Sequence, residues 1–256
     1  MSVGDDLVHL QLSDKVATIT LDSPQNRNAL SRRLVADLED RLVAADAAAV
    51  RVIVLTHTGG TFCAGADLKE AVEVGMEEGT RGLLRLLRLV VSLSTPVVGV
   101  VSGHVRAGGV GLVGACDVAL VTDESTFAFS EALLGLTPAI ISLTTSSRLR
   151  EREAAWKYLT GTTFSGVEAV RTGLVTESVD RDQVPDRLRE VLSRFVAVAP
   201  QGLRETKALL NQPLLERIDR DGEALVALSA RLFASDEAHE GMTAFREKRP
   251  PRWVDG

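Results

Sequence analysis

The chain has 256 residues, of which 45% are hydrophobic and 25% charged, so it can bury a sizeable core and lacks the composition of a disordered chain. Its formal net charge of −6 argues against nucleic acid as a partner, because neutralising phosphates requires a basic surface. Two cysteines are too few for a disulfide framework or a cysteine-based metal site, and no apolar run reaches the ~18–20 residues that span a bilayer.

The N-terminal sequence MSVGDDLVHL is acidic and lacks the pattern of a signal peptide, which favours a cytoplasmic protein without a membrane partner. Polarity then alternates over 8–12 and 15–21 on either side of a turn, which predicts a β-hairpin. From Ser31, a suitable N-cap, leucines recur at helical spacing, so a helix is predicted to about Ala49. Further along, we expect buried strands over 51–56, 96–103 and 117–122, a long loop over 57–70, a helix over 80–93 and a short strand over 127–129.

The chain from Pro138 onward is expected to be mainly helical. Ser165 and Glu168 form a capping-box pattern before a short helix over 167–173. Other expected elements of this part are helices over 138–149, 202–211, 214–234 and 236–248, and a last strand over 176–180. Because the expected strands end before 198-VAPQG-202, we predict an α/β core domain over 1–197, completed by a helical region over 198–256.

The stretch 109-GVGLVG-114 has the G-x-G-x-x-G spacing that can mark a dinucleotide-binding turn. In that fold the first glycine directly follows a strand, and a full helix separates it from the next strand. Here residues 103–107 intervene after the expected strand, and the next strand begins near Asp117, which leaves room for only about two helical turns. We therefore do not expect a bound NAD.

Gly108 and Gly109 instead begin a short apolar helix, and the loop 63-CAGADL-68 has the same design. The first N–H groups of a helix lack partners and carry partial positive charge, and glycine lets a ligand atom approach the backbone closely. Two such N–H groups from two loops are what an oxyanion hole requires. The alternative, that both glycine clusters serve only tight turns or close packing, is equally compatible with these residues.

Six segments spread along most of the chain together resemble the crotonase family, the enoyl-CoA hydratase/isomerase superfamily. Each segment is modest, and it is their order and spacing that carry the resemblance. The segments are 22-DSPQNRNALS-31, 58-TGGTFCAGADLKE-70, residues 96–118 with their ACD, 127-FAFSEALLGLTPA-139, 172-TGLV-175 and 241-GMTAFREKRPPRW-253.

The resemblance implies an α/β fold, a crotonase-like spiral of ββα units with a C-terminal helical trimerisation region, assembled as a homotrimer or homohexamer. It implies an acyl-CoA thioester as substrate and no separate cofactor, because coenzyme A is part of that substrate. The thioester oxygen would lie between the backbone N–H groups of Ala66 and Gly108, which would stabilise an enolate as it develops. One donor of a comparable oxyanion hole contributes ~3–4 kcal/mol.

The resemblance also implies contacts with the substrate and its coenzyme A, and Gly109 and Gly111 of the glycine run are among the residues expected to make them. Ala64 and Leu68 would flank the path of the adenine and pantetheine, and Arg27 would lie near the phosphates. Lys248 would approach the phosphates from the C-terminal region of the same or a neighbouring subunit. For Arg27 and Lys248 the alternative is a solvated surface charge. Asp67 is expected to cap the helix that follows Ala66 and so to fix the loop.

One position departs from the family pattern. Hydratases of this family use two glutamates around the substrate double bond, one to hold water and one to move a proton. The second matches Glu131, for which the alternative is a salt-bridged structural role. The first would follow the glycines as GGxE, but this chain has 108-GGVG-111, with Gly111 at that place. Asp117 lies too far along to replace it and matches a structural acid.

Glu131 alone is compatible with more than one outcome. It can hydrate a 2-enoyl-CoA if another group holds the water, which is the reaction we favour. It is also sufficient to shift a double bond between positions 3 and 2, and without turnover the chain would be a non-catalytic acyl-CoA-binding protein. His104 and Arg106 precede the glycines and are candidates to contact a polar acyl group. Side chains expected to serve structure or packing are His57, Cys63 and Cys116.

Overall fold

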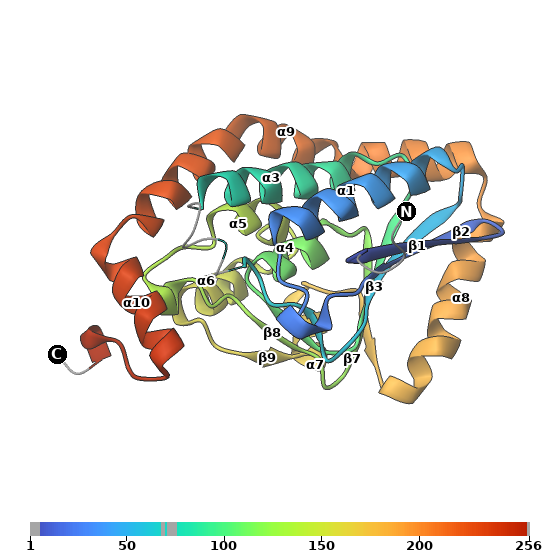
Figure 1. The fold of residues 1–256 in the computed structure, drawn as a ribbon. Helices are drawn as coiled ribbons and strands as arrows, with labels where there is room; N and C mark the ends of the chain where they lie inside the picture. The colour runs from blue at the N-terminus through green and yellow to red at the C-terminus, as the bar shows by residue number, and fades with distance from the viewer. Residues whose placement is uncertain (1–5, 68–69, 71–75, 255–256) are drawn as a thin grey trace.

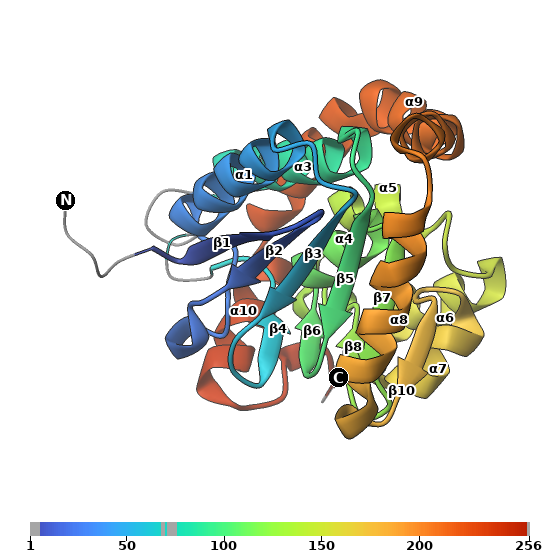
Figure 2. The same cartoon turned by 90° about the vertical axis from the view of Figure 1, so that its right-hand side faces the viewer.

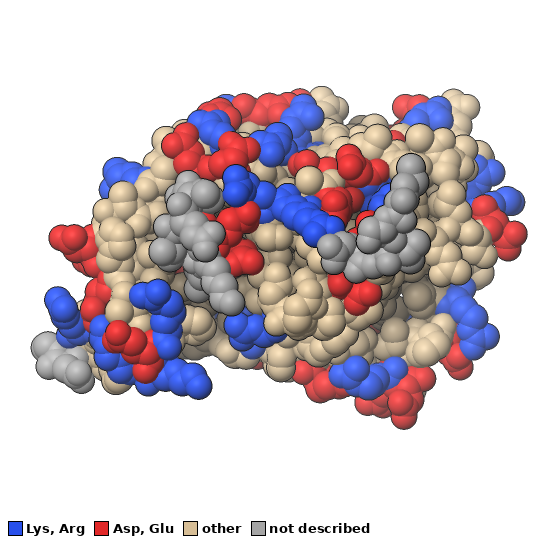
Figure 3. Space-filling view, viewed as in Figure 1, with Lys and Arg blue, Asp and Glu red and all other residues tan. Residues whose placement is uncertain are grey.

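The computed structural model describes residues 6–67, 70 and 76–254 of the chain (Figure 1). These residues form two β-sheets enclosed by helices. No helix within the described ranges is both long and apolar enough to cross a membrane. Over the face drawn in Figure 3, acidic and basic side chains are interspersed, so the net negative charge does not form one acidic patch there.

The larger sheet is built mostly from the apolar, β-branched runs of the first half of the chain. Its first two strands form the predicted antiparallel hairpin, and the others pair in parallel. In spatial order the strands are β1 (Val8–Ser13), β2 (Val16–Leu21), β3 (Val52–His57), β5 (Val97–Val101), β7 (Val118–Thr122) and β10 (Glu177–Val179).

The smaller sheet consists of strands of two or three residues. In spatial order these are β4 (Thr61–Cys63), β6 (His104–Arg106), β8 (Thr126–Ala128) and β9 (Phe164–Ser165). The pairs β3–β4, β5–β6 and β7–β8 each place one strand in the large sheet and the next in the small sheet, before the chain goes on to a helix or a 3-10 turn. This repetition confirms the predicted α/β spiral of ββα units.

Helices cover both faces of the larger sheet. On one face lie α1 (Arg32–Ala47), α3 (Glu77–Ser92) and α4 (Gly108–Ala115), which share the main hydrophobic core with the strands. On the other face α8 (Val184–Ala197) packs Leu188, Val191 and Phe195 against buried valines of β3 and β5. Figure 2 shows this arrangement, with α1 and α3 on the side of the sheet opposite α8.

Further helices surround this core. One short helix, η1 (Pro24–Asn26), comes from the first half of the chain. The others come from the second half and are η2 (Ala132–Leu134), α5 (Ala139–Thr145), α6 (Glu151–Thr160), α7 (Gly166–Thr172), η3 (Arg181–Gln183), α9 (Pro200–Phe233), α10 (Asp236–Glu247) and η4 (Arg252–Val254). The long helix α9 lies along α3 and contacts α5, and α10 lies against η2 at the α6 end of the molecule (Figure 1).

Two helix predictions were wrong. The helices expected over 202–211 and 214–234 are one continuous helix, α9, with Pro213 inside it. A proline leaves the carbonyl four residues earlier without its helical partner, and here that residue is Leu209, which is 70% exposed at the surface of the helix. The helix expected over 138–149 ends at Thr145. Its serine and threonine hydroxyls donate to carbonyls one turn back, as Thr145 does to Ile141, which competes with continued helix.

The six residues 109–114 lie inside α4 and are all buried. A pyrophosphate-binding glycine pattern must lie in an open turn between a strand and a helix, where its N–H groups are free. Here the Val110 and Gly111 N–H groups already donate to the Ala107 carbonyl, at 2.8 and 3.4 Å. The placement therefore agrees with the expectation that GVGLVG is not a dinucleotide fingerprint.

Candidate active site

The loop that carries Ala66 and the turn that carries Gly108 are in direct contact. Gly65, at φ +91°, is in a conformation that favours glycine. A Cβ atom on Gly65 would lie 2.9 Å from the Cβ of Ala107 and 3.6 Å from the nitrogen of Gly108. Any side chain at position 65 would force the two loops apart, so the small residues read from the sequence are required for this approach.

Backbone hydrogen bonds fix each loop on a different element. The Leu30 N–H donates to the Gly65 carbonyl at 2.8 Å, beside an isolated parallel bridge between Leu30 and Ala66. The Ala107 N–H donates to the Ala128 carbonyl of β8 at 3.2 Å. Ala107 has φ 46° and ψ −119°, a rare conformation for a residue with a side chain, and it sets the plane of the peptide that carries the Gly108 N–H.

The two predicted donors are free within the described part of the chain. Neither the Ala66 N–H nor the Gly108 N–H donates to an acceptor among the described residues. Gly108 is the first residue of α4, where the N–H groups have no partner in the helix and carry partial positive charge. The contact of the two loops thus brings together two free N–H groups, which can stabilise negative charge on an oxygen placed between them.

Glu131 follows β8 and precedes η2. Its Oε2 atom is buried and has no hydrogen-bond partner among the described residues, and no ion pair of Glu131 is found there. Burial raises the pKa of the Glu131 carboxyl to about 7. This does not match the alternative of a salt-bridged structural glutamate, and a carboxyl that titrates near neutrality is suited to proton transfer.

Two hydroxyl side chains near Glu131 were not identified from the sequence. The ring of Tyr158 of α6 is tilted against that of Phe129, with centroids 4.6 Å apart, and its hydroxyl lies 2.6 Å from the Thr145 Oγ1 of α5. Burial raises the pKa of Tyr158, and the negative charge of Glu131 raises it further. The one signal in the sequence was that Tyr158 is the chain's single tyrosine.

Gly109 and Gly111, which were predicted to contact the substrate, face protein rather than an open site. A Cβ atom on Gly111 would lie 2.6 Å from the Cγ2 and 2.9 Å from the Cβ of Ile141 in α5. A Cβ atom on Gly109 would lie 2.7 Å from the Cβ of Cys63. The space next to Gly111 is therefore filled by an apolar side chain.

Only some of the residues predicted to contact coenzyme A are linked to one another by hydrogen bonds. The Ala64 N–H donates to the carbonyl of the exposed Arg27 at 3.1 Å, so these two lie together. Asp67 Oδ1 accepts a hydrogen bond from the Glu70 N–H at 3.3 Å, as an N-cap does. Lys248 is exposed at the C-cap of α10, and no hydrogen bond within the described residues links it to Arg27. Leu68 lies outside the described residues.

The two polar candidates of β6 are engaged with β8. His104 Nδ1 lies 2.7 Å from Thr126 Oγ1, and Arg106 donates to the Thr126 carbonyl and hydroxyl at 2.7 and 2.9 Å. Burial lowers the pKa of Arg106. His57 Nε2 accepts the Ser102 N–H at 3.1 Å, which is a structural contact.

Both cysteines are buried, free thiols, and burial raises the pKa of Cys63 and of Cys116 to about 12. Thiols with such pKa values stay protonated at neutral pH and are poor nucleophiles. Their surroundings therefore agree with the packing role that the sequence suggested.

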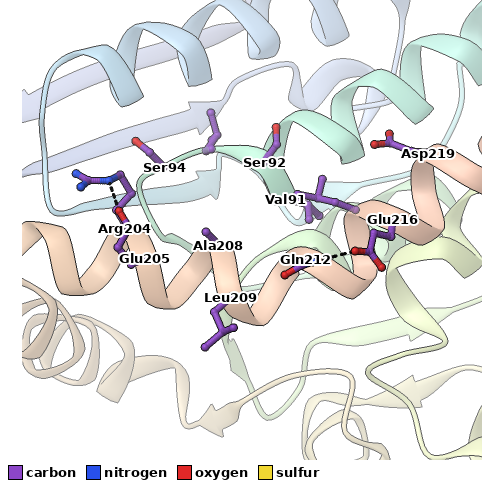
Figure 4. A pocket seen from close by; sticks show the side chains of 12 residues that line it. Val91, Ser92, Ser94, Arg204, Glu205, Ala208, Leu209, Gln212, Glu216 and Asp219 are labelled. Carbon is purple, nitrogen blue, oxygen red and sulfur yellow. Dashed lines mark hydrogen bonds and ion pairs between the residues drawn. The ribbon is translucent and has the colours of Figure 1, made fainter.

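A groove of about 750 Å³ lies away from these residues, between the C-terminal end of α3 and α9 (Figure 4). Its walls include Val91, Ser94, Ala208 and Gln212, and it is lined by none of the predicted site residues. The free N–H groups of Ala66 and Gly108 and the buried Oε2 of Glu131 therefore lie outside this groove.

Comparisons with known proteins point to one family. The family model described as "Enoyl-CoA hydratase/isomerase" matches residues 11–256. The crystal structure of an enoyl-CoA hydratase from Mycobacterium avium is 47% identical, with a TM-score of 0.91 over 98% of this chain and 100% of that one. A mevalonyl-coenzyme A hydratase of Aspergillus fumigatus is 32% identical over 93% of this chain and 91% of its own length. A crotonyl-CoA hydratase of Syntrophomonas wolfei is 28% identical over 96% of both chains.

Proposed function

The chain belongs to the enoyl-CoA hydratase/isomerase family, and on that premise we propose that it is an enoyl-CoA hydratase, which adds water across the double bond of a 2-enoyl-CoA. The observation that carries the proposal is the carboxyl of Glu131, whose buried Oε2 has no partner among the described residues and whose pKa is raised to about 7. The names of the similar proteins, which are hydratases of CoA thioesters, favour hydration over other reactions of the family.

The Ala66 and Gly108 N–H groups are the proposed oxyanion hole. When a nucleophile adds to carbon 3 of a 2-enoyl thioester, negative charge moves onto the thioester oxygen. Two fixed N–H donors at that oxygen stabilise the enolate, and because their loops are already held by Leu30 and Ala128 they need little reorganisation.

Glu131 is the proposed proton-transfer group. Hydration needs a proton removed from water as its oxygen bonds to carbon 3 and a proton delivered to carbon 2. Near pH 7 Glu131 is divided between its acid and its carboxylate, so it can take one proton and return it without help from a second carboxyl. Tyr158 and Thr145, whose hydroxyls are paired beside it, are the proposed groups that orient the water.

A double-bond isomerase is the second candidate, and the Gly111–Ile141 contact favours it. The place of the family's first glutamate is occupied by an apolar side chain, so no carboxyl holds water from that side. Isomerisation needs no water, only one base that takes a proton from carbon 2 and returns it to carbon 4. Glu131 alone meets that requirement.

Absorbance of the conjugated thioester separates the two reactions. A hydratase removes the absorbance of a 2-enoyl-CoA, whereas an isomerase leaves that substrate unchanged and creates the absorbance from a 3-enoyl-CoA. We expect loss on crotonyl-CoA, a 10²–10⁴-fold lower kcat for Glu131→Gln, as is typical of a lost general acid or base, and wild-type rates for the exposed control Glu151→Gln. Conversion of the 3-enoyl-CoA alone would establish the isomerase instead. Binding without turnover of either substrate would establish a non-catalytic binding protein.

The remaining assignments belong to the same proposal. The substrate is an acyl-CoA thioester, with no other cofactor, and Arg27, Ala64, Asp67, Leu68 and Lys248 form or support its coenzyme A site. We propose a cytoplasmic homotrimer or homohexamer, in which residues 198–256 are the region that assembles the subunits around the 1–197 core.

A further inference from the structure

The turn that follows Glu131 lies directly against the C-terminal helix α10. A Cβ atom on Gly241 would lie 2.6 Å from the carbonyl carbon and oxygen of Leu134. A Cβ atom on Gly135 would lie 2.8 Å from the carbonyl carbon of Glu237. Because positions 237 and 241 are one helical turn apart, they share a face of α10. The backbones of the turn and of α10 therefore touch at two successive points, and only glycines leave room for it.

The same turn holds the backbone of Glu131. The Glu131 carbonyl accepts hydrogen bonds from the Leu134 N–H and the Leu136 N–H, both at 2.9 Å. At the carboxyl, Oε2 has no hydrogen-bond partner among the described residues, and the hydrogen bond that lowers its pKa comes from the backbone of Glu131 itself. Its position is consequently set by its backbone and by packing, and a displacement of Leu134 and Gly135 is passed to Glu131 through the two hydrogen bonds.

The helix that supports this turn is fixed at both ends. Ser235 caps its start, where Oγ accepts the Ala238 N–H at 3.2 Å. Beyond its end, Arg249 pairs with Glu240 at 2.7 Å, and hydrogen bonds from Arg249 lower the pKa of the Glu240 carboxyl to about 2. A helix held in this way can act as a rigid support.

We propose that Gly135 and Gly241 are positioning residues for Glu131, through which α10 sets the place of its carboxyl. The inference rests on the proposed role of Glu131 and goes beyond it, because it makes the C-terminal helix a part of the catalytic apparatus. The titratable neighbour on another element is Tyr158 of α6, which Arg217 of α9 also influences.

The variant that tests the proposal is Gly241→Ala. Ordinary contact needs at least 3.4 Å, so α10 and Leu134 must separate by about 1 Å. A misplacement of about 1 Å at a catalytic group can lower the rate on the order of 100-fold. We expect kcat to fall roughly 10- to 100-fold with KM within about twofold, and the pKa of Glu131 to move toward its ordinary value. The matched control is Gly202→Ala in α9, where the nearest atom would be 3.9 Å away, and it should behave as wild type.

A second pair of variants covers the case in which Gly241→Ala does not fold. Ser235→Ala removes the cap of the first turn of α10 without touching the turn after Glu131, and Ser235→Asp retains a capping oxygen. Fraying of that turn, which carries Glu237, should lower kcat about two- to fivefold in Ser235→Ala, and Ser235→Asp should restore it. Equal rates in wild type and both variants would overturn the proposal.

The pKa of Glu131 is to be measured without substrate, by ¹³C NMR of glutamate-labelled protein, with its resonance assigned by its loss in Glu131→Gln. A shifted pKa in Gly241→Ala, in a protein that turns over no enoyl-CoA, would support the positioning and reject the proposed function. Loss of turnover in Glu131→Gln, together with wild-type kcat and pKa in a folded Gly241→Ala, would support the function and reject the positioning.

Discussion

The Glu131 carboxyl is buried at a free-energy cost that depends on pH. Burial raises its pKa from the ordinary 4.5 to about 7, so between these values the folded chain binds a proton that the unfolded chain has released. The contribution of protonated Glu131 to the free energy of unfolding is therefore fully present below about pH 4.5 and is lost as the pH rises through about 7. A shift of this size corresponds to roughly 3 kcal/mol.

Glu131→Gln should remove this pH dependence, because glutamine keeps the shape of the protonated acid and cannot ionise. We expect its free energy of unfolding to match that of wild type at pH 4.5 and to exceed it by about 2–3 kcal/mol at pH 8. Urea unfolding of both proteins across this range measures the difference. The exposed Glu151→Gln should show no such divergence, and parallel curves for Glu131→Gln and wild type would contradict the buried ionisation.

At the scale of the residue, the roles of Glu131, Ala66 and Gly108 stay predictions, made because each stands in a segment that resembles a family motif. The sequence did not predict the environment of Glu131. The raised pKa depends on burial, and Tyr158, whose own pKa the charge of Glu131 raises, comes from a helix that no local pattern connects to Glu131. The strained Ala107 was missed for a related reason, since nothing in its type marks a positive φ.

At the scale of the element, the early strands and several helices were predicted, whereas the helices α6 and α8 and the shortest strands of the small sheet were not. The N-cap of α1 is confirmed by the hydrogen bond from the Leu34 N–H to Ser31 Oγ at 3.2 Å. The expected loop over 57–70 contains β4, and the expected connector over 103–107 contains β6. A strand of three residues has too little length to show periodicity, and it exists only because a strand from a distant segment pairs with it. The capping box was half right: Ser165 Oγ accepts the Glu168 N–H, but the Glu168 carboxylate pairs with Lys157.

The contact between α4 and α5 at Gly111 predicts a cost for even one methyl group. Gly111→Ala improves helix propensity by up to about 1 kcal/mol, but its Cβ would lie 2.6 Å from Ile141 Cγ2 in a packed core. Overpacking of a core costs typically 1–3 kcal/mol. We expect Gly111→Ala to lower the free energy of unfolding by about 1–2 kcal/mol, as measured in urea.

Two comparisons identify Ile141 as the cause. Gly79→Ala, in the first turn of α3 with no atom within 4 Å of the added Cβ, should be neutral or slightly stabilising. The double variant Gly111→Ala/Ile141→Ala should lose less stability than the two single variants together, because the second truncation removes Cγ2, the Ile141 atom nearest to the added Cβ, although Cβ remains. Strict additivity would show that Ile141 does not fill this space.

At the scale of the whole molecule, the C-terminal region is joined to the core by a buried polar network. Lys207 of α9 donates to the carbonyls of Val90 and Thr95 at 3.1 and 3.0 Å, and its Nζ lies 2.9 Å from Asp117 Oδ2. Asn211, one turn along α9, donates to Asp117 Oδ1 at 3.0 Å. Asp117 is thus the structural acid that the sequence suggested. Its partners could not be read from the sequence, because they lie about 90 residues away.

This network predicts that residues 1–197 and 198–256 unfold together. Lys207→Met leaves the Asp117 carboxylate in the interior without its cation, and removing one partner of a buried ion pair costs about 3–5 kcal/mol. Arg204→Met, three residues earlier on α9, breaks only the exposed pair with Glu205 in the groove wall of Figure 4 and should cost about 0–1 kcal/mol.

Urea unfolding at fixed protein concentration, followed by circular dichroism and tryptophan fluorescence, measures both effects. Tryptophan fluorescence monitors both parts, because Trp156 lies in the core part and Trp253 in the C-terminal part. Since the two parts are expected to unfold together, both probes should report one transition. The double variant Lys207→Met/Asp117→Asn should recover part of the loss, because it leaves no unpaired buried charge. Equal losses for Lys207→Met and Arg204→Met, or two separated transitions in the wild-type chain, would mean that Lys207 and Asp117 do not hold the C-terminal helices to the core.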